Sequence, residues 1–216
     1  MFSEAVTEEQ IFIPGELDGS VFAASRLDEA SAVGVVTMGF STDPVARWVY
    51  PDPSEYLNWF PSFIRAFAGR SFENGSAYRT RDMAGAALWL PPGVHSDDDT
   101  VAELSQRTVE RSKQADLFAV FEEMGAYHPD EPHWYLPMIA VDGYMQGKGT
   151  GTKLMRHALA RCDQDGLPAY LESTNPRNIS LYTRFGFEIV GKIQVGGSPP
   201  IFPMLRTARG WSTFSS

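Results

Sequence analysis

The chain has 216 residues, of which 43% are hydrophobic and 21% are charged, and its formal net charge is −9. This length suits one domain, and the composition is that of a globular protein whose core needs no disulfide or metal. The acidic balance argues against nucleic acid as a partner, because phosphate binding requires a basic face. The sequence shows no apolar run long enough to span a membrane and no N-terminal basic segment followed by an apolar stretch, so we expect a cytoplasmic protein.

The residues that most often bind metals show no metal-site pattern. The four histidines have no ligand-like spacing with one another or with the single cysteine; they are His95, His128, His133 and His157. Cys162 cannot form an internal disulfide and lies in a helical pattern that is typical of a packing residue. We therefore expect neither a zinc site nor a disulfide.

The first part of the chain predicts an arm, a strand and a helix. Residues 1–19 are mixed in character and are interrupted by Pro14 and Gly15, which is typical of an arm ahead of the main fold. Residues 20–27 read as a first strand. A helix follows, with Asp28 as its cap.

An aromatic-rich segment comes next. Three prolines predict a loop or several short turns over residues 41–54. Aromatic and aliphatic residues at helical spacing predict a helix over residues 55–68, which Pro61 kinks or restarts. The aromatic side chains of the first half could wall a closed pocket; they are Trp48, Tyr50, Tyr56, Trp59, Phe60, Phe63 and Trp89.

The middle of the chain predicts a hairpin and a long helical region. Residues 76–81 and 85–90 flank a short turn and read as two antiparallel strands. The acidic cluster at 97–99 reads as a solvated helix start. The helical region that follows reaches Met124 and is expected to split near Ser112.

The second half alternates between strands and helices. The predicted elements are a strand (133–141), a helix (149–165), a strand (169–173), a short helix (177–185) and two further strands (188–195 and 202–206). Such alternation is typical of an α/β protein. The first strand of this half leads into a glycine-rich segment, which therefore connects a strand to a helix.

This segment, Gln146-Gly147-Lys148-Gly149-Thr150-Gly151, predicts an anion site. The first N–H groups of a helix have no partners inside it, and the helix dipole adds positive charge at the same end. Glycine lets a phosphate oxygen reach the backbone, because no side chain stands in the way. Lys148 and Lys153 add positive charge nearby.

Three phosphate-loop patterns compete for this segment. The nucleotide triphosphatase pattern needs two glycines framing four residues before Lys-Ser/Thr, and the chain lacks it. The dinucleotide fingerprint G-x-G-x-x-G is not matched, because residues 147–151 read G-x-G-x-G. The third pattern, Gln/Arg-x-x-Gly-x-Gly/Ala, is satisfied by Gln146, Gly149 and Gly151.

With this third pattern the sequence resembles the GCN5-related N-acetyltransferase (GNAT) superfamily, whose coenzyme-binding motif it is. Both flanks support the resemblance. The apolar run from Leu136 to Asp142 precedes the loop, and the series Asn178, Tyr182, Gly186-Phe187 follows it at the family's spacing. A closer resemblance, over residues 129–206, is to the puromycin N-acetyltransferase-like branch.

The resemblance implies a fold and a co-substrate. The implied architecture is the α/β (α+β) GNAT fold, as one domain over residues 1–216. Its mixed central sheet of about seven strands would be splayed between the fourth and fifth strands and would carry helices on both faces. Residues 133–206 would form the coenzyme-binding half. The co-substrate would be acetyl-CoA, and no metal would be required.

The resemblance also implies which residues hold acetyl-CoA. Backbone groups of Ile139, Ala140 and Val141 would pair with the pantetheine arm like an added strand. The loop residues that would hold the pyrophosphate are Gln146, Gly147, Lys148, Gly149, Thr150, Gly151 and Thr152. Asn178 would hydrogen-bond the arm, cap the next helix, or do both.

Two residues are expected to move protons. Tyr182 is the candidate acid for the departing thiolate, with packing under the coenzyme as the alternative. Glu172 is the candidate base for the amine. Because a carboxylate in a central strand is rarely free, the alternative is a structural carboxylate paired with Arg177, Arg184 or backbone groups.

The implied reaction is transfer of an acetyl group from acetyl-CoA to the primary amine of a small molecule, by direct attack on the thioester. Two alternatives stay open. One is a protein or peptide N-acetyltransferase, and the other is a coenzyme-binding GNAT domain with a sensor or scaffold role and no turnover. We expect a small amine as partner, and no nucleic acid or membrane. The oligomeric state, monomer or homodimer, stays open.

Overall fold

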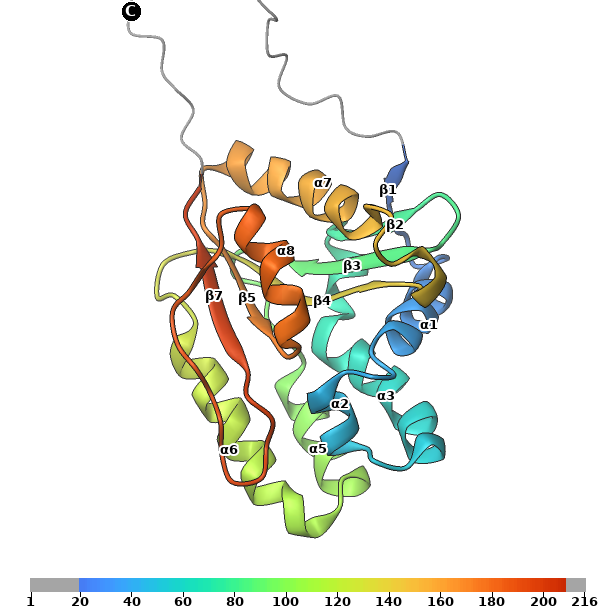
Figure 1. Ribbon diagram of the computed structural model, residues 1–216, viewed down its shortest axis with the longest axis vertical. Helices are drawn as coiled ribbons and strands as arrows, with labels where there is room; N and C mark the ends of the chain where they lie inside the picture. Colours follow the sequence, from blue (N-terminus) through green and yellow to red (C-terminus); the bar gives the residue numbers. More distant parts are fainter. Residues whose placement is uncertain (1–19, 209–216) are drawn as a thin grey trace, which may run out of the picture.

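The computed structural model describes residues 20–208, which form a seven-stranded sheet with helices on both faces (Figure 1). The strand order is β1-β2-β3-β4-β5-β7-β6. Neighbouring strands run antiparallel except β4 and β5, which run parallel. The predicted mixed sheet of the GNAT fold is therefore confirmed. The predicted arm, residues 1–19, lies outside the described residues.

The strands are β1 (Val21–Ala23), β2 (Ala77–Thr80), β3 (Gly85–Leu90), β4 (Trp134–Val141), β5 (Ala169–Ser173), β6 (Glu188–Ile189) and β7 (Phe202–Arg206). The α-helices are α1 (Glu29–Gly39), α2 (Pro44–Val49), α3 (Pro53–Ala68), α4 (Arg70–Glu73), α5 (Asp98–Thr108), α6 (Arg111–Tyr127), α7 (Thr150–Asp165) and α8 (Ile179–Arg184). Two 3-10 turns, η1 (Gly143–Met145) and η2 (Pro176–Asn178), precede α7 and α8.

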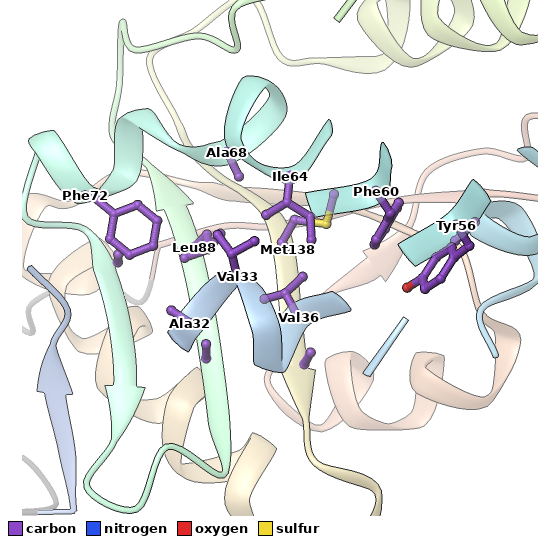
Figure 2. Close-up of a cluster of buried hydrophobic side chains, with 14 of the residues drawn as sticks. Ala32, Val33, Val36, Tyr56, Phe60, Ile64, Ala68, Phe72, Leu88 and Met138 are labelled. Carbon is purple, nitrogen blue, oxygen red and sulfur yellow. The ribbon is translucent and has the colours of Figure 1, made fainter. Parts of the chain in front are cut away.

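Each face of the sheet buries its own core. On one face, side chains of α1, α3 and α4 gather against Leu88 of β3 and Met138 of β4 (Figure 2). On the other face, α7 packs Leu154 and Met155 into a cluster that includes Trp89 of β3. Because neighbouring residues of a strand point to opposite faces, the two cores divide β3 between them.

An extra residue in β4 changes which face its side chains point to. The register with β3 runs from Leu88↔Met138 to Leu90↔Tyr135, so three residues of β4 oppose two of β3. Before this bulge the even-numbered Leu136 packs with α7, whereas after it the odd-numbered Ile139 does so. Pro137 lies inside the bulge and has no N–H to donate, which favours a break in the ladder at this point.

The bulge coincides with the separation of β4 from β5. Within the described residues, these two strands pair at Trp134↔Ala169 and Tyr135↔Tyr170 and no further. A strand bends where it is bulged, so the rest of β4 turns away from its parallel neighbour. The predicted splay between the fourth and fifth strands is therefore confirmed, and Pro137 stands at its start.

The prediction of a loop or several short turns over residues 41–54 was wrong in part. The segment contains α2, in which Pro44 occupies the first helical turn and the Asp43 carboxylate accepts hydrogen bonds from the N–H groups of Val45 and Ala46. A proline is tolerated there because the first N–H groups of a helix have no helical partner. The prolines thus mark the start of a helix and not an irregular segment.

Pro61 does not restart a helix, because α3 runs through it without interruption. Proline cannot donate to the carbonyl four residues earlier, which belongs to Leu57. Leu57 is 54% exposed, so solvent can take the place of the missing donor. The predicted split of the long helical region is confirmed, since α5 ends at Thr108 and α6 begins at Arg111.

Three edge elements also differ from expectation. β1 is shorter than predicted, α4 was not predicted, and β6 ends at Ile189 although the sequence predicted a strand to 195. After β6 the chain runs close against α6, and a Cβ on Gly191 would collide with the Tyr127 ring. Beyond Ile189, pairing with the segment that leads into β7 continues as an isolated antiparallel bridge, Ile193↔Ile201. None of the helices in residues 20–208 is long and apolar enough to cross a membrane.

Candidate active site

The predicted anion loop has the backbone of a phosphate-binding turn. Gly147 and Gly149 have φ angles of +74° and +86°, which side chains disfavour. Gly149 is the N-cap of α7 and no side chain caps that helix. The first intrahelical donor is the Lys153 N–H, which bonds to the Gly149 carbonyl at 3.0 Å. The N–H groups of the preceding three residues are therefore the ones that helix geometry leaves available to an anion.

Side chains of the loop divide into those that hold it and those that face outward. The Gln146 amide donates to the Val141 carbonyl at 3.3 Å and ties the loop to the end of β4. The Thr150 side chain is buried and would contact any Cβ placed on Gly85 of β3. The Lys148 ammonium lies 3.8 Å from the Met145 sulfur. Thr150 can thus offer an anion its backbone, while its methyl group anchors α7.

A cavity of about 710 Å³ extends from this loop into the gap between β4 and β5. Its lining includes every predicted site residue except Lys148; they are Ile139, Ala140, Val141, Gln146, Gly147, Gly149, Thr150, Gly151, Thr152, Glu172, Asn178 and Tyr182. The structure therefore brings together residues that the sequence spreads over more than forty positions. Lys148 lies in the loop but outside the cavity wall.

Asn178 does not take the capping role that the sequence left open. It precedes α8 in a helical conformation and makes no side-chain cap hydrogen bond. Asn175 caps the preceding 3-10 turn η2, since its side-chain oxygen accepts a hydrogen bond from the Arg177 N–H at 3.1 Å. The Asn178 side chain is therefore exposed at the cavity without being tied to the helix it begins.

Tyr182 lies on α8, with its ring against Phe187 and at the cavity wall. Burial raises the pKa of its phenol above the ordinary value of 10.0, and the nearby Asp43 carboxylate raises this pKa further. The phenol therefore keeps its proton through the neutral pH range. Packing and cavity contact occur together at this residue, so the two interpretations of Tyr182 are compatible.

Glu172 points to the α6 side of β5, and its side chain is 2% exposed. It is not paired with Arg177 or Arg184, as one alternative expected. One carboxylate oxygen lies 3.4 Å from Nε2 of His128, the residue that follows α6. Burial raises the pKa of Tyr135 and of Tyr170 well above 10.0, and the Glu172 charge adds to both shifts. The carboxylate thus lies in a wall of one imidazole and two neutral phenols.

Two cavity residues escaped the sequence analysis. Asp43 is buried, and its Oδ2 accepts a hydrogen bond from the Thr174 hydroxyl at 2.7 Å. This contact joins α2 to the end of β5, beside the gap in the sheet. The Asp43-Pro44 pair was the available signal, because an acidic residue before a proline is typical of a capped helix start.

One part of the cavity wall is aromatic. Phe60, Phe63 and Phe67 of α3 lie along it, and Phe121 of α6 stacks on Phe63 with ring centroids 6.4 Å apart. Of the sequence's predicted aromatic wall, Tyr50, Phe60 and Phe63 line this cavity, whereas Trp89 is fully buried in the core under α7. The Glu172 carboxylate lines the same cavity as these aromatic side chains and the loop.

Several other side chains take structural roles. Asp97 caps α5 by accepting from the Thr100 N–H at 3.2 Å, as expected for a helix start. Cys162 lies on the buried face of α7, and burial raises the pKa of its thiol to about 12. Trp134 packs in the same core and donates to Asp165 at 3.1 Å. Over the described part of the chain, no cluster of three or more His, Cys, Asp or Glu could hold a metal ion.

Comparison with known proteins agrees with this geometry. Residues 83–187 match the model of the "Acetyltransferase (GNAT) family". An uncharacterized N-acetyltransferase of Schizosaccharomyces pombe is 30% identical over 182 residues, which cover 76% of this chain and 74% of that protein. The chain belongs to the GNAT family.

Solved GNAT structures show the same fold at lower identity. A Corynebacterium glutamicum structure described as histone acetyltransferase HPA2 and related acetyltransferase has a TM-score of 0.63 and 24% identity, covering 90% of this chain and 98% of the other. Arylalkylamine N-acetyltransferase 2 of Aedes aegypti has a TM-score of 0.61 and 12% identity, covering 88% and 98%. This GNAT protein is thus an acetyltransferase, and its resemblance to the puromycin N-acetyltransferase-like branch stays a prediction.

Proposed function

We propose that this GNAT protein transfers an acetyl group from acetyl-CoA to the primary amine of a small molecule with an apolar body. The observation that carries the proposal is the continuity of one cavity. It joins the uncapped start of α7, the open edge of β4, the Glu172 carboxylate and a wall of phenylalanines. The cavity could therefore bind the pyrophosphate and the extended arm of the coenzyme, and the amine and the apolar body of the acceptor.

The loop suits the pyrophosphate of the coenzyme. Two glycines with positive φ and an uncapped helix start present backbone N–H groups to an anion. Nothing lies within 4 Å of the Cβ position of Gly147 or Gly149, so the space beside the loop is free for a phosphate. The exposed edge of β4 beyond Tyr135 could then pair with the amide groups of the pantetheine arm.

The chemistry follows from this placement. The neutral amine attacks the thioester carbonyl, a C–N bond forms, and the C–S bond breaks as the tetrahedral intermediate collapses. Glu172 would accept the proton that the amine loses, and Tyr182 would give a proton to the departing thiolate. Backbone N–H groups of β4 would stabilise the oxyanion. The raised pKa of Tyr182 keeps the phenol protonated until the thiolate forms.

The aromatic wall supports an acceptor with an apolar body. Phe63, Phe67 and Phe121 are partly exposed to the cavity, whereas the neighbouring Phe60 is buried. Burying an apolar ring against them would stabilise the complex by roughly 25 cal/mol per Å² of apolar surface. An amine with a short polar body would leave this wall in contact with water.

Thiol release with a panel of amines tests the proposal. The panel contains 2-phenylethylamine, propylamine, an aminonucleoside and a lysine-containing peptide. We expect kcat/KM for 2-phenylethylamine to exceed that for propylamine by about tenfold or more, as one added apolar group contributes about 1–3 kcal/mol. Preference for the peptide would instead establish a peptide acetyltransferase. Coenzyme binding without turnover of any amine would establish a sensor or scaffold role.

A matched pair of variants locates the acceptor site. Phe63→Ala removes a ring from the wall of the first cavity, and Phe118→Ala removes a ring of α6 that lines a different cavity. We expect Phe63→Ala to reduce the preference for 2-phenylethylamine, and Phe118→Ala to retain it. Equal loss of the preference in both variants would contradict the assignment of the wall.

A further inference from the structure

A second cavity, of about 760 Å³, lies next to the one that contains Glu172. Its lining includes His95, His128 and His133, and Tyr135 lines both cavities. Glu172 belongs to the first cavity and His128 to the second, and their side chains meet at 3.4 Å. An imidazole nitrogen and a carboxylate oxygen therefore face each other, at ion-pair distance, across the wall between the two cavities.

The histidine contact continues beyond His128. Nδ1 of His128 lies 3.0 Å from Nε2 of His133, and Nδ1 of His133 lies 2.8 Å from the Glu131 carbonyl oxygen. A carbonyl oxygen can only accept, so Nδ1 of His133 carries a proton and Nε2 is the free acceptor. Nδ1–H of His128 then donates to it. In the neutral pair, Nε2 of His128 is left as the proton acceptor that faces Glu172.

We propose that His128 and His133 relay the proton that Glu172 takes from the acceptor amine to water in the second cavity. This inference rests on the proposed function, in which Glu172 is the base. His128 and His133 act through Glu172 and do not touch the reacting atoms. Their role is to return Glu172 to its charged form while the first cavity is occupied by amine and coenzyme.

Each step moves one proton and no electrons. The proton leaves the amine nitrogen for a Glu172 oxygen, and then passes to Nε2 of His128. The resulting imidazolium gives its Nδ1 proton to Nε2 of His133. His133 then releases its own Nδ1 proton from the Glu131 carbonyl to water in the second cavity. Exchange of ring protons with that water restores the starting tautomers.

The surroundings of the pair favour release at the His133 end. Burial lowers the pKa of His133 below 6.5, so its imidazolium gives up a proton readily at neutral pH. The Glu131 carbonyl and the Glu172 charge oppose this shift, and the charges of His128 and His95 add to it.

The other groups facing the pair are the phenols of Tyr135 and Tyr170, whose ring centroids lie 4.6 and 4.5 Å from that of His128. Their pKa values are raised by burial and then by Glu172, so both stay neutral and do not compete for the proton. The two phenols therefore border the proposed path without carrying its proton.

The test compares His128→Gln with His95→Gln. Glutamine at 128 keeps a polar side chain beside Glu172 but cannot pass a proton, whereas His95 lines the second cavity outside the relay. We expect His128→Gln to lower kcat at pH 7 by about tenfold or more, with KM for the amine within about twofold. The deficit should shrink at high pH, where the amine loses its proton to solvent. His95→Gln should keep kcat and the pH profile.

A second variant distinguishes loss of proton transfer from misfolding. His128→Ala leaves room beside the second cavity, and added imidazole should restore part of its kcat in a dose-dependent manner. A wild-type pH profile of kcat in His128→Gln would overturn the relay. So would a His128→Ala variant that folds and binds the coenzyme but whose kcat is not restored by imidazole. Failure of the wild type to release thiol with any amine would instead overturn the proposed function, so the two outcomes are separate.

Discussion

The hydroxyl of Thr174 donates a 2.7 Å hydrogen bond to Oδ2 of Asp43, which joins two residues 131 positions apart in the chain. The other carboxylate oxygen accepts from the N–H groups of Val45 and Ala46 at the start of α2. One buried carboxylate therefore joins the start of α2 to the end of β5. It also raises the pKa of Tyr182, so it bears on the candidate acid as well.

Asp43→Ala should lower the free energy of unfolding by about 2.5–4 kcal/mol. The loss combines a helix cap, worth about 1 kcal/mol, with a buried hydrogen bond to a charged group, worth about 1.5–3 kcal/mol. Urea unfolding measures this change. Asp43→Asn can still cap α2 through its carbonyl oxygen, so it should lose less. Equal stability of Asp43→Ala and the wild type would contradict the tie between α2 and β5.

The same residue gives the protein a pH-dependent stability term. Burial raises the pKa of Asp43, and the hydrogen bonds from Thr174, Ala46 and Val45 offset part of that shift. A raised pKa means that the folded state binds the proton more tightly than the unfolded state, so this contribution falls as pH rises through the folded pKa. The stability of the wild type relative to Asp43→Asn should therefore decrease from about pH 4 upward. An increase of this stability difference over that range would mean that folding lowers the pKa of Asp43.

Two glycines of the loop should respond differently to alanine. Gly149 has a φ of +86°, so Gly149→Ala should cost about 1–2 kcal/mol and weaken binding of acetyl-CoA. Gly151 has a helical backbone, and a Cβ there would meet Leu181 and Val141 at 3.5 and 3.7 Å, which are ordinary contacts. Gly151→Ala should therefore keep stability and binding. Calorimetric titration with acetyl-CoA measures the affinity of each variant, and urea unfolding measures its stability. Equal effects of the two changes would contradict the loop geometry.

Tyr182→Phe should separate chemistry from binding. Removing the phenolic oxygen leaves the ring against Phe187, so the melting temperature and acetyl-CoA affinity should change little. The chemical step should slow by about a hundredfold, the lower range for loss of a positioned proton donor. Single-turnover kinetics report this step directly. A rate within twofold of the wild type would leave Tyr182 with packing alone.

Glu172→Gln tests the candidate base through the pH–rate profile. At neutral pH the amine substrate is largely protonated and needs a base, whereas at high pH it loses its proton to solvent. The variant should therefore be impaired at neutral pH and recover toward high pH. Because Gln keeps the size of the side chain beside His128, a structural loss should be small. A profile parallel to that of the wild type would remove Glu172 from the base role.

The sequence predicted best what lies close together along the chain. The strand into the glycine loop and α7 was recognisable, because turn residues, helix-start signals and alternation of elements are local properties. The spacing of a motif downstream of that loop predicted that Asn178 and Tyr182 belong to the site, and both line the cavity. Their roles in binding and catalysis stay predictions.

Contacts between distant segments could not be predicted in the same way. The partner of Glu172 proved to be His128 and not a nearby arginine, since strand β5 points this carboxylate toward the end of α6. Nothing in a single sequence pairs residues from separate elements. Pro137 was a neglected signal, because a proline in a central strand indicates a bulge, and this bulge lies where the sheet opens.

Thermal unfolding with and without acetyl-CoA tests the central claim most directly, because it needs no knowledge of the amine. At a hundred times its dissociation constant, a ligand of the folded state adds about 2.7 kcal/mol. For a chain of this length, this corresponds to a rise in melting temperature of about 5–10 °C. We expect that rise with acetyl-CoA and its reduction in Gly149→Ala. An unchanged melting temperature at millimolar acetyl-CoA would contradict the coenzyme site at the start of α7.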